Sequence, residues 1–324
     1  MGTLRRQWAR SPRDPAPFQT LTARSHRAEA ILRIFYAFPP FWVVTHLDLL
    51  RPLLDPQAPF LRWPVAWMAW VGVSTAAPIL LALALGAFML GAFLPEHRAI
   101  RIAVFVAWLE VLGLGFSFGK IHHLNHGLLF TSFIFAAFVP DAAFRAHSAT
   151  RTERQHGLLG LHAAMTMLAL TYSLAGVGKL LGTAYQAALG QITPLHPSAL
   201  ARHIADRLLQ TYPESILGGF MIEYGVWLWP MMLATVYIQL FALVAAFRPR
   251  LHRLWGVGLM GFHVVTALTM TIDFSPNLIL LGLLWLASPF APETFDLRAL
   301  AADLPLVGRP LRRQDFLRRW SSSS

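Results

Sequence analysis

The sequence predicts an all-α protein, a polytopic integral membrane helical bundle of about eight transmembrane helices with both termini cytoplasmic. The chain is 56% hydrophobic and 13% charged, with a mean hydropathy of +0.50, whereas a soluble domain carries about 25% charged residues. Several apolar runs have lengths near the roughly 20 residues that a helix needs to cross a bilayer. The basic residues gather between these runs, where they indicate membrane topology.

Eight apolar segments can be placed along the chain from hydropathy and flanking charges. The first contains Pro39 and Pro40, which predict a kink or a break. The second and the sixth are long, so each either tilts or includes an interfacial piece. The expected segments are 28–50, 64–95, 100–118, 126–143, 158–180, 217–247, 254–272 and 276–292.

The distribution of positive charge predicts the orientation of these segments. With the N-terminus in the cytoplasm, 21 of the 27 Lys and Arg residues fall in the two terminal segments and the inner loops. Cytoplasmic loops carry the excess of Lys and Arg, so both termini are expected inside, in a bacterial plasma (inner) membrane. The organisation predicted is a basic cytoplasmic segment 1–27, a transmembrane domain 28–292 and a basic cytoplasmic tail 293–324, expected to be solvated and flexible.

The stretch between Leu181 and Ser215, on the outer side in this topology, is too polar to span a membrane, and residues 196–213 lie within it. Leu200, Ile204 and Leu208 recur every four residues in it, which predicts a short amphipathic helix. Such a helix lies on the outer membrane surface, or it is an ordinary helix within a loop. Both interpretations fit the pattern.

Composition also excludes several classes of function. The chain has no cysteine, which excludes disulfides, thiolate metal sites and cysteine nucleophiles. No basic patch is interleaved with aromatic residues, so we expect no nucleic-acid partner. Residues 1–27 contain no apolar core, so we expect no cleavable signal peptide.

Polar residues at membrane depth gather on the outer side of the predicted bundle. Such residues are costly in a bilayer and tend to be functional. Each also has a structural interpretation: a buried histidine often only satisfies a hydrogen bond, and a glutamate often pairs with a cation. His122 and His126 would suit a metal if they were helical, but Gly119 and Asn125 suggest a turn there, and we expect no metal site. The candidates are Glu110, Asn125, His126, Lys179, Glu223, His263 and Asp273.

Lys179 is notable because the chain has only two lysines, Lys120 and Lys179, among its 27 basic residues. One interpretation is a side chain that extends from the end of an apolar helix to water. The other is a proton acceptor, because a desolvated lysine can lose its proton whereas arginine stays protonated.

Three stretches in order give the chain a family resemblance. "LNHGLLFTSFIF" resembles an Asn-His segment followed by a short helix, and "YSLAGVGKL" is similar to a Tyr…Ala-Gly…Lys-Leu motif. "GFHVVTALTMTIDFSPNLILLGLLWLASPF" resembles a Phe-His helix followed by a helix that ends in Ser-Pro. With "EAILRIFYAF" near the start, these stretches resemble the vitamin K-dependent gamma-carboxylase and the bacterial HTTM (horizontally transferred transmembrane) proteins. The resemblance covers about residues 25–292.

The resemblance implies a role for each matching residue. Lys179 occupies the position of the base that acts on vitamin K hydroquinone, and His126 and His263 occupy the two histidine positions. Asn125 and Tyr172 belong to the same motifs, and Glu110 and Glu223 share their depth, so these four are expected around a quinone or hydroquinone. The implied activity is that of a quinone- and oxygen-dependent lyase, of the carboxylase and epoxidase type, acting on an exported peptide or a lipid.

The chain departs from the carboxylase at two points. The doubled lysine of the family is here Gly178-Lys179, and the large non-cytoplasmic domain that binds substrate in the carboxylase has no counterpart after residue 292. Glutamate carboxylation itself is therefore not implied. The second hypothesis is a non-enzymatic membrane factor that binds or matures an exported peptide. A transporter is a weaker third, because no internal repeat is visible and the polar groups lie on one side.

Overall fold

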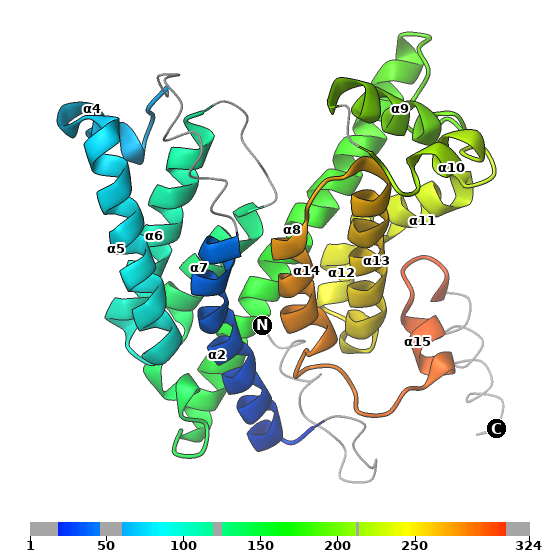
Figure 1. Ribbon diagram of the computed structural model, residues 1–324. Helices are drawn as coiled ribbons and strands as arrows, with labels where there is room; N and C mark the ends of the chain where they lie inside the picture. Colours follow the sequence, from blue (N-terminus) through cyan, green and yellow to red (C-terminus); the bar gives the residue numbers. More distant parts are fainter. Residues whose placement is uncertain (1–18, 46–59, 119–124, 212–213, 309–324) are drawn as a thin grey trace, which may run out of the picture.

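The fold is entirely helical over the residues that the structure describes. The computed structural model describes residues 19–45, 60–118, 125–211 and 214–308, and every regular element in these ranges is a helix (Figure 1). The predicted all-α class is confirmed there. Most of the basic N-terminal segment, the end of the first predicted segment, His122, and the tail beyond residue 308 lie outside the described residues.

Within the described residues, three helices are long and apolar enough to cross a membrane, which is consistent with a membrane protein. They are α5 (Val73–Phe93), α6 (Arg98–Phe116) and α8 (Arg151–Ala188). Two shorter apolar helices accompany them: α7 (His126–Phe138) and the stretch Ser275–Leu286, which joins α14 (Ser275–Leu281) to a π-helical turn.

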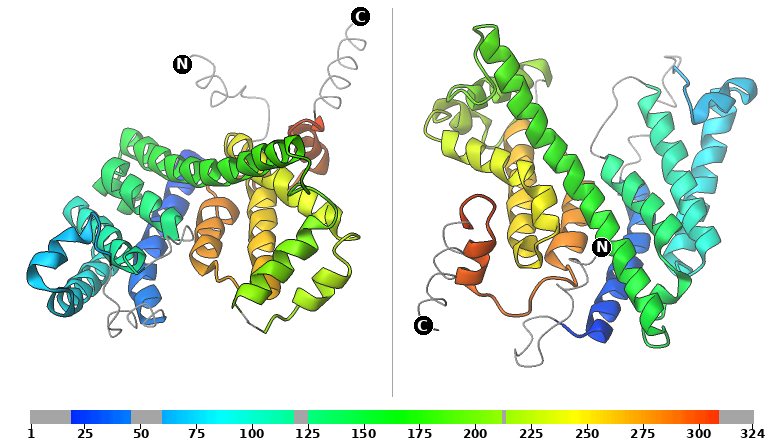
Figure 2. Two further views of the ribbon diagram at one scale, coloured as in Figure 1. Left: turned by 90° about the horizontal axis from the view of Figure 1, so that it is seen from above. Right: turned by 180° about the vertical axis from the view of Figure 1, so that it is seen from behind.

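The helices form two groups that α8 connects. The first group contains α2, α5, α6 and α7, and the second contains α11 to α14 (Figures 1 and 2). α8 begins beside the first group, crosses the molecule diagonally, and ends beside the second. The remaining bounds are α2 (Leu21–Thr45), α11 (Trp229–Leu240), α12 (Ala242–Ala246) and α13 (His252–Met270).

The long predicted segments are interrupted, as expected if they include interfacial pieces. The segment 64–95 is divided at Gly72, whose φ of 90° favours glycine, into α4 (Met68–Val71) and α5. The segment 217–247 consists of α10 (Gly218–Glu223), α11 and α12. By contrast, α2 continues through Pro39 and Pro40, so a break there was a wrong prediction. Tertiary packing explains the continuity, because Tyr36 and Trp42 on either side of the prolines are buried.

Buried aromatic rings form the centre of the core. The ring of Trp108 lies 4.9 Å from that of Trp42 and 4.8 Å from that of Phe88, which joins α6 to α2 and α5. The same apolar cluster continues through Leu168 of α8 to Trp255 of α13. The two groups of helices therefore share one core.

A buried arginine joins two loops at the end of the molecule where α6 and α8 begin. The side chain of Arg101 is fully buried. Its guanidinium donates to the carbonyl oxygens of Pro95 and Glu96 at 3.0 Å and of Val139 at 2.7 Å. It also pairs with Oδ1 of Asp141 at 2.9 Å. Arg101 is therefore a structural link between the α5–α6 and α7–α8 connections.

The predicted amphipathic helix is present as α9 (Ala199–Thr211). Its apolar face packs against the protein, because Ile204 is fully buried. A Cβ atom on Gly218 would lie only 2.7 Å from Cδ1 of Leu208, so α9 and α10 are in close contact. α9 therefore behaves as a packed loop helix on this face.

The first part of the predicted tail is folded, contrary to expectation. α15 (Leu297–Asp303) follows the last core helix. The hydroxyl of Tyr237 in α11 donates to the carbonyl of Pro305 at 2.7 Å, and Arg248 donates to the carbonyl of Asp303. Because these bonds hold the segment against α11 and α12, residues 293–308 are not a free solvated chain.

Candidate functional site

A tyrosine–histidine pair lies between α8 and α13. The hydroxyl of Tyr172 and Nε2 of His263 are 2.5 Å apart, and both side chains are buried. The ring of Phe274 lies 4.4 Å from the imidazole, between centroids. Two polar groups thus satisfy each other in apolar surroundings, where an unpaired polar group would be costly.

Two buried polar atoms, one of them in this pair and one before α7, have no hydrogen-bond partner among the described residues. They are Nδ1 of His263 and Oδ1 of Asn125, which precedes α7. The neighbouring Gly127 allows α7 to approach α8 and α14, since its Cβ would lie 3.3 Å from both Leu168 and Asn277. Leu168 is one helical turn from Tyr172. Asn125 precedes α7 and His263 lies in α13, and both of these helices contact α14. Each unpaired atom is suited to a small polar ligand.

Lys179 is hydrogen-bonded to a neutral side chain. Its Nζ donates to Oε1 of Gln239 in α11 at 2.8 Å, and Gln239 is buried. Lys179 follows Tyr172 by two helical turns, which places the two on nearly the same face of α8, about 20° apart. An amide oxygen accepts a hydrogen bond from an amine as well as from an ammonium, so this partner does not require a charged lysine.

Small residues let α8 and α11 approach closely beside Lys179. A Cβ atom on Gly176 would lie 2.6 Å from the backbone nitrogen of Leu240. The hydroxyl of Ser173 donates to the carbonyl of Leu240 at 3.1 Å and accepts from the backbone N–H of Leu243 at 2.9 Å. This contact fixes where Gln239 stands relative to Lys179.

The other predicted site residues occupy different surroundings. His126 is the first residue of α7, and its ring lies 5.6 Å from that of Phe116. Glu110 accepts from Nε1 of Trp67 at 3.0 Å on the α5–α6 side of the molecule. Glu223 is exposed at the end of α10. The structure thus brings Tyr172 and His263 into contact and places Lys179 in line with them, whereas the two glutamates lie elsewhere.

Sequence reasoning missed a second histidine cluster at the other end of α8. Nδ1 of His252 lies 2.8 Å from Oγ of Ser288, and its Nε2 lies 3.0 Å from the carbonyl of Ala246. Nε2 of His162 lies 3.1 Å from the same carbonyl. His252 lies in the arginine-rich stretch between the predicted segments 217–247 and 254–272, so the sequence placed it in a loop. The sequence also carries no signal for Gln239, because no motif includes it.

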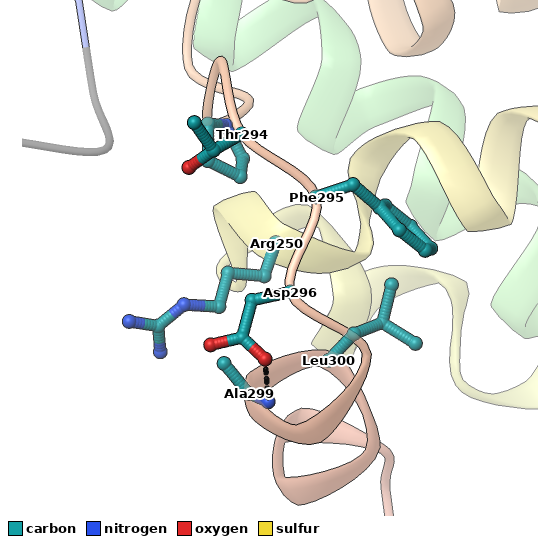
Figure 3. A pocket seen from close by; sticks show the side chains of 7 residues that line it. Arg250, Thr294, Phe295, Asp296, Ala299 and Leu300 are labelled. Carbon is teal, nitrogen blue, oxygen red and sulfur yellow. Dashed lines mark hydrogen bonds between the residues drawn. The ribbon is translucent and has the colours of Figure 1, made fainter.

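A small hollow lies at the start of α15 (Figure 3). Its volume is about 100 Å³, and Arg250, Phe295 and Leu300 are among its lining residues. The Asp296 carboxylate accepts from the backbone N–H of Ala299 at 3.1 Å and so caps the helix. The Asp296 carboxylate in this hollow is therefore already used by the fold.

The fold and these contacts define an all-helical protein with helices long enough to cross a membrane and a buried polar interface along α8. No family model, curated protein or solved structure matches the chain.

Proposed function

We propose that the chain is a multi-pass protein of the bacterial plasma membrane, with eight membrane segments and both ends cytoplasmic. The distribution of basic residues supports this, with 21 of 27 on one side. Exposed tryptophans provide an independent argument, because tryptophan is enriched at membrane–water boundaries. Trp63, Trp70 and Trp227 are at least 80% exposed. Trp63 precedes the predicted segment 64–95, Trp70 lies in α4 near the predicted outer end of that segment, and Trp227 lies between α10 and α11.

Reporter fusions should test this topology. A reporter inserted near Leu195 is expected to be active only outside the cytoplasm, and one placed after Arg319 only inside it. At each position two reporters are fused in turn: one is active only in the cytoplasm, and the other is active only outside it. Activity of both fusions in the same compartment would contradict the proposed topology.

We further propose that the chain is an HTTM-type enzyme related to the vitamin K-dependent gamma-carboxylase, with its reactive site along α8. The Tyr172–His263 hydrogen bond, with Lys179 on the same helix face, is the observation that carries this proposal. This hydrogen bond connects the stretch "YSLAGVGKL", which contains Tyr172, with the stretch that begins "GFHVV", which contains His263. Both stretches contribute to the family resemblance. The substrate class is an exported peptide or a lipid at the outer leaflet.

Two unpaired polar atoms among the described residues can form hydrogen bonds with the oxygens of a quinone-type ring. The unpaired Nδ1 of His263 can donate to a quinone carbonyl or accept from a hydroquinone O–H, according to its tautomer, and Oδ1 of Asn125 can accept from a hydroquinone O–H. A bound hydroquinone supplies an acidic ring O–H and two electrons for the reduction of oxygen. Lys179 Nζ accepts the proton as a neutral amine, and Gln239 holds that nitrogen in place. Tyr172 keeps the imidazole of His263 oriented.

Lipid extraction of the purified protein tests this assignment directly. We expect a membrane quinone to co-purify with the wild-type chain, and His263→Ala to reduce its amount about tenfold because a ring contact and the orientation of Tyr172 are lost. His147→Ala, at an exposed position, is the matched control and should retain the quinone. The readout is the molar ratio of quinone to protein by chromatography and mass spectrometry. Equal amounts of quinone in the wild type and both variants would show that the Tyr172–His263 pair does not hold it.

The second candidate function is a non-enzymatic membrane factor that binds or matures an exported peptide. The Lys179–Gln239 hydrogen bond favours it, because a lysine with a satisfied bond can simply tie α8 to α11. Under this alternative, Arg at position 179 keeps the link and the function. The substitution of Lys179 therefore separates the two functions.

A further inference from the structure

We propose that a hollow at the beginning of α6 and α8 binds the headgroup of a phospholipid that carries a primary amine. The hollow measures about 410 Å³, and Arg98, Phe138, Asp141, Glu153 and His156 are among its lining residues. Sites for small ligands typically span about 300–1,000 Å³. The proposal rests on the membrane arrangement proposed above, which places this hollow at the inner boundary.

The hollow presents two basic side chains that can hold a phosphate. Arg98 is exposed and uses one N–H in a bond of 3.3 Å to the carbonyl of Ala137. Its other N–H groups and the exposed imidazole of His156 have no partner in the described part of the chain. A guanidinium offers several donors in a planar array, which suits phosphate oxygens.

The hollow also presents two carboxylates, each with one oxygen already bonded. Oε2 of Glu153 accepts from the backbone N–H of Thr150 at 2.8 Å and from its hydroxyl at 2.7 Å, which leaves Oε1 available. Asp141 pairs with Arg101 through Oδ1, which leaves its Oδ2 available to a ligand. Within the described residues neither carboxylate forms an ion pair with Arg98. The open side of the hollow therefore has both a cationic and an anionic part.

A row of aromatic rings leads out of the hollow along α7 and α6. Phe138 lines the hollow and is 63% exposed. Its ring lies 6.4 Å from that of Phe133, which lies 5.3 Å from that of Phe105. Because α7 runs from Phe133 towards Phe138, the row extends from the hollow towards the middle of the proposed membrane layer. An acyl chain would lie along this row while the headgroup occupies the hollow.

The chemistry of the hollow selects one kind of headgroup. A phosphate alone would meet Arg98 and His156 but would face the two carboxylates unfavourably. An added ammonium with N–H groups donates to Oε1 of Glu153 and Oδ2 of Asp141, and a quaternary choline nitrogen has no such donor. The headgroup that complements both parts is phosphoethanolamine.

Native mass spectrometry of the purified full chain in detergent tests this inference. Phosphatidylethanolamine, phosphatidylcholine and phosphatidylglycerol with identical acyl chains are titrated separately. We expect phosphatidylethanolamine to bind at least about fivefold more tightly than the other two, because only its headgroup adds a cation with N–H donors to the phosphate; the glycerol hydroxyls of phosphatidylglycerol are uncharged. Arg98→Gln should weaken it about tenfold. Glu153→Gln should abolish the preference over phosphatidylcholine, while a glutamine at this position still completes the helix cap.

Arg151→Gln is the matched control, because it removes the same charge from an exposed position of α8 outside the hollow. Equal affinities for the three lipids, tightest binding of phosphatidylglycerol, or equal effects of Arg98→Gln and Arg151→Gln would overturn the inference. The measurement involves neither Lys179 nor a quinone. Failure of the proposed enzyme function and failure of this inference are therefore distinguishable.

Discussion

Arg101→Ala is expected to destabilise the folded protein strongly. The substitution removes the partner of two buried carbonyl oxygens, of the part-buried carbonyl oxygen of Glu96 and of the half-exposed Asp141 carboxylate. Each unsatisfied buried acceptor costs about 1–3 kcal/mol, and local relaxation recovers part of this cost. We expect a net loss of about 3–5 kcal/mol, against a typical stability of about 5–15 kcal/mol.

Fluorescence-detected size-exclusion chromatography after heating gives the midpoint of unfolding for each variant in detergent. Arg101→Lys should be intermediate, because an ammonium keeps the charge but cannot reproduce the planar array of donors. Arg145→Ala, at an exposed position, should differ from the wild type by less than about 0.5 kcal/mol. An unchanged midpoint for Arg101→Ala would mean that water replaces the guanidinium at no cost.

Lys179→Arg should reduce function by about 100-fold or more while the protein remains folded and inserted. If Lys179 is a base, it must release and accept a proton, which arginine does not do. Oε1 of Gln239 accepts a hydrogen bond from a guanidinium as readily as from an amine. The contact with α11 is therefore retained, and only the proton chemistry is lost.

The readout is rescue of the growth or peptide-maturation phenotype of a deletion strain, with expression checked by blot. Lys120→Arg, at the other lysine of the chain, is the matched control. Gln239→Glu provides an independent arm, because a carboxylate beside Nζ stabilises the ammonium. The base interpretation predicts loss of function in Gln239→Glu, and the anchor interpretation predicts a normal protein. Full activity of Lys179→Arg would make the non-enzymatic factor the better explanation.

Hydropathy predicted the helical class because an apolar run of sufficient length has few alternatives in a bilayer. It could not locate the interruption at Gly72, because that break depends on a backbone angle and not on polarity. It also could not predict the folding of residues 293–308. That segment is held by hydrogen bonds to backbone carbonyls, which any sequence provides.

For the candidate site, sequence motifs located Tyr172, Lys179 and His263, but not their partners. Tyr172 and His263 are 91 positions apart in the chain, and only the packing of α8 against α13 makes them neighbours. Gln239 was missed because an uncharged amide in an apolar run carries no signal of its own. Glu110 and Glu223 share a predicted depth with the site, but depth alone does not specify which side of a helix bundle a residue occupies.

The unbroken length of α8 has a mechanical consequence. Its 38 residues contain no proline and extend for about 57 Å, so the helix acts as a stiff rod with its first turn at the Glu153 hollow. Lys179 lies about 43 Å from that end. A rotation of about 5° around the first turn would displace Lys179 by about 4 Å, more than the length of its bond to Gln239. The precise seating of α8 at one face of the molecule therefore determines the alignment of groups near the opposite face.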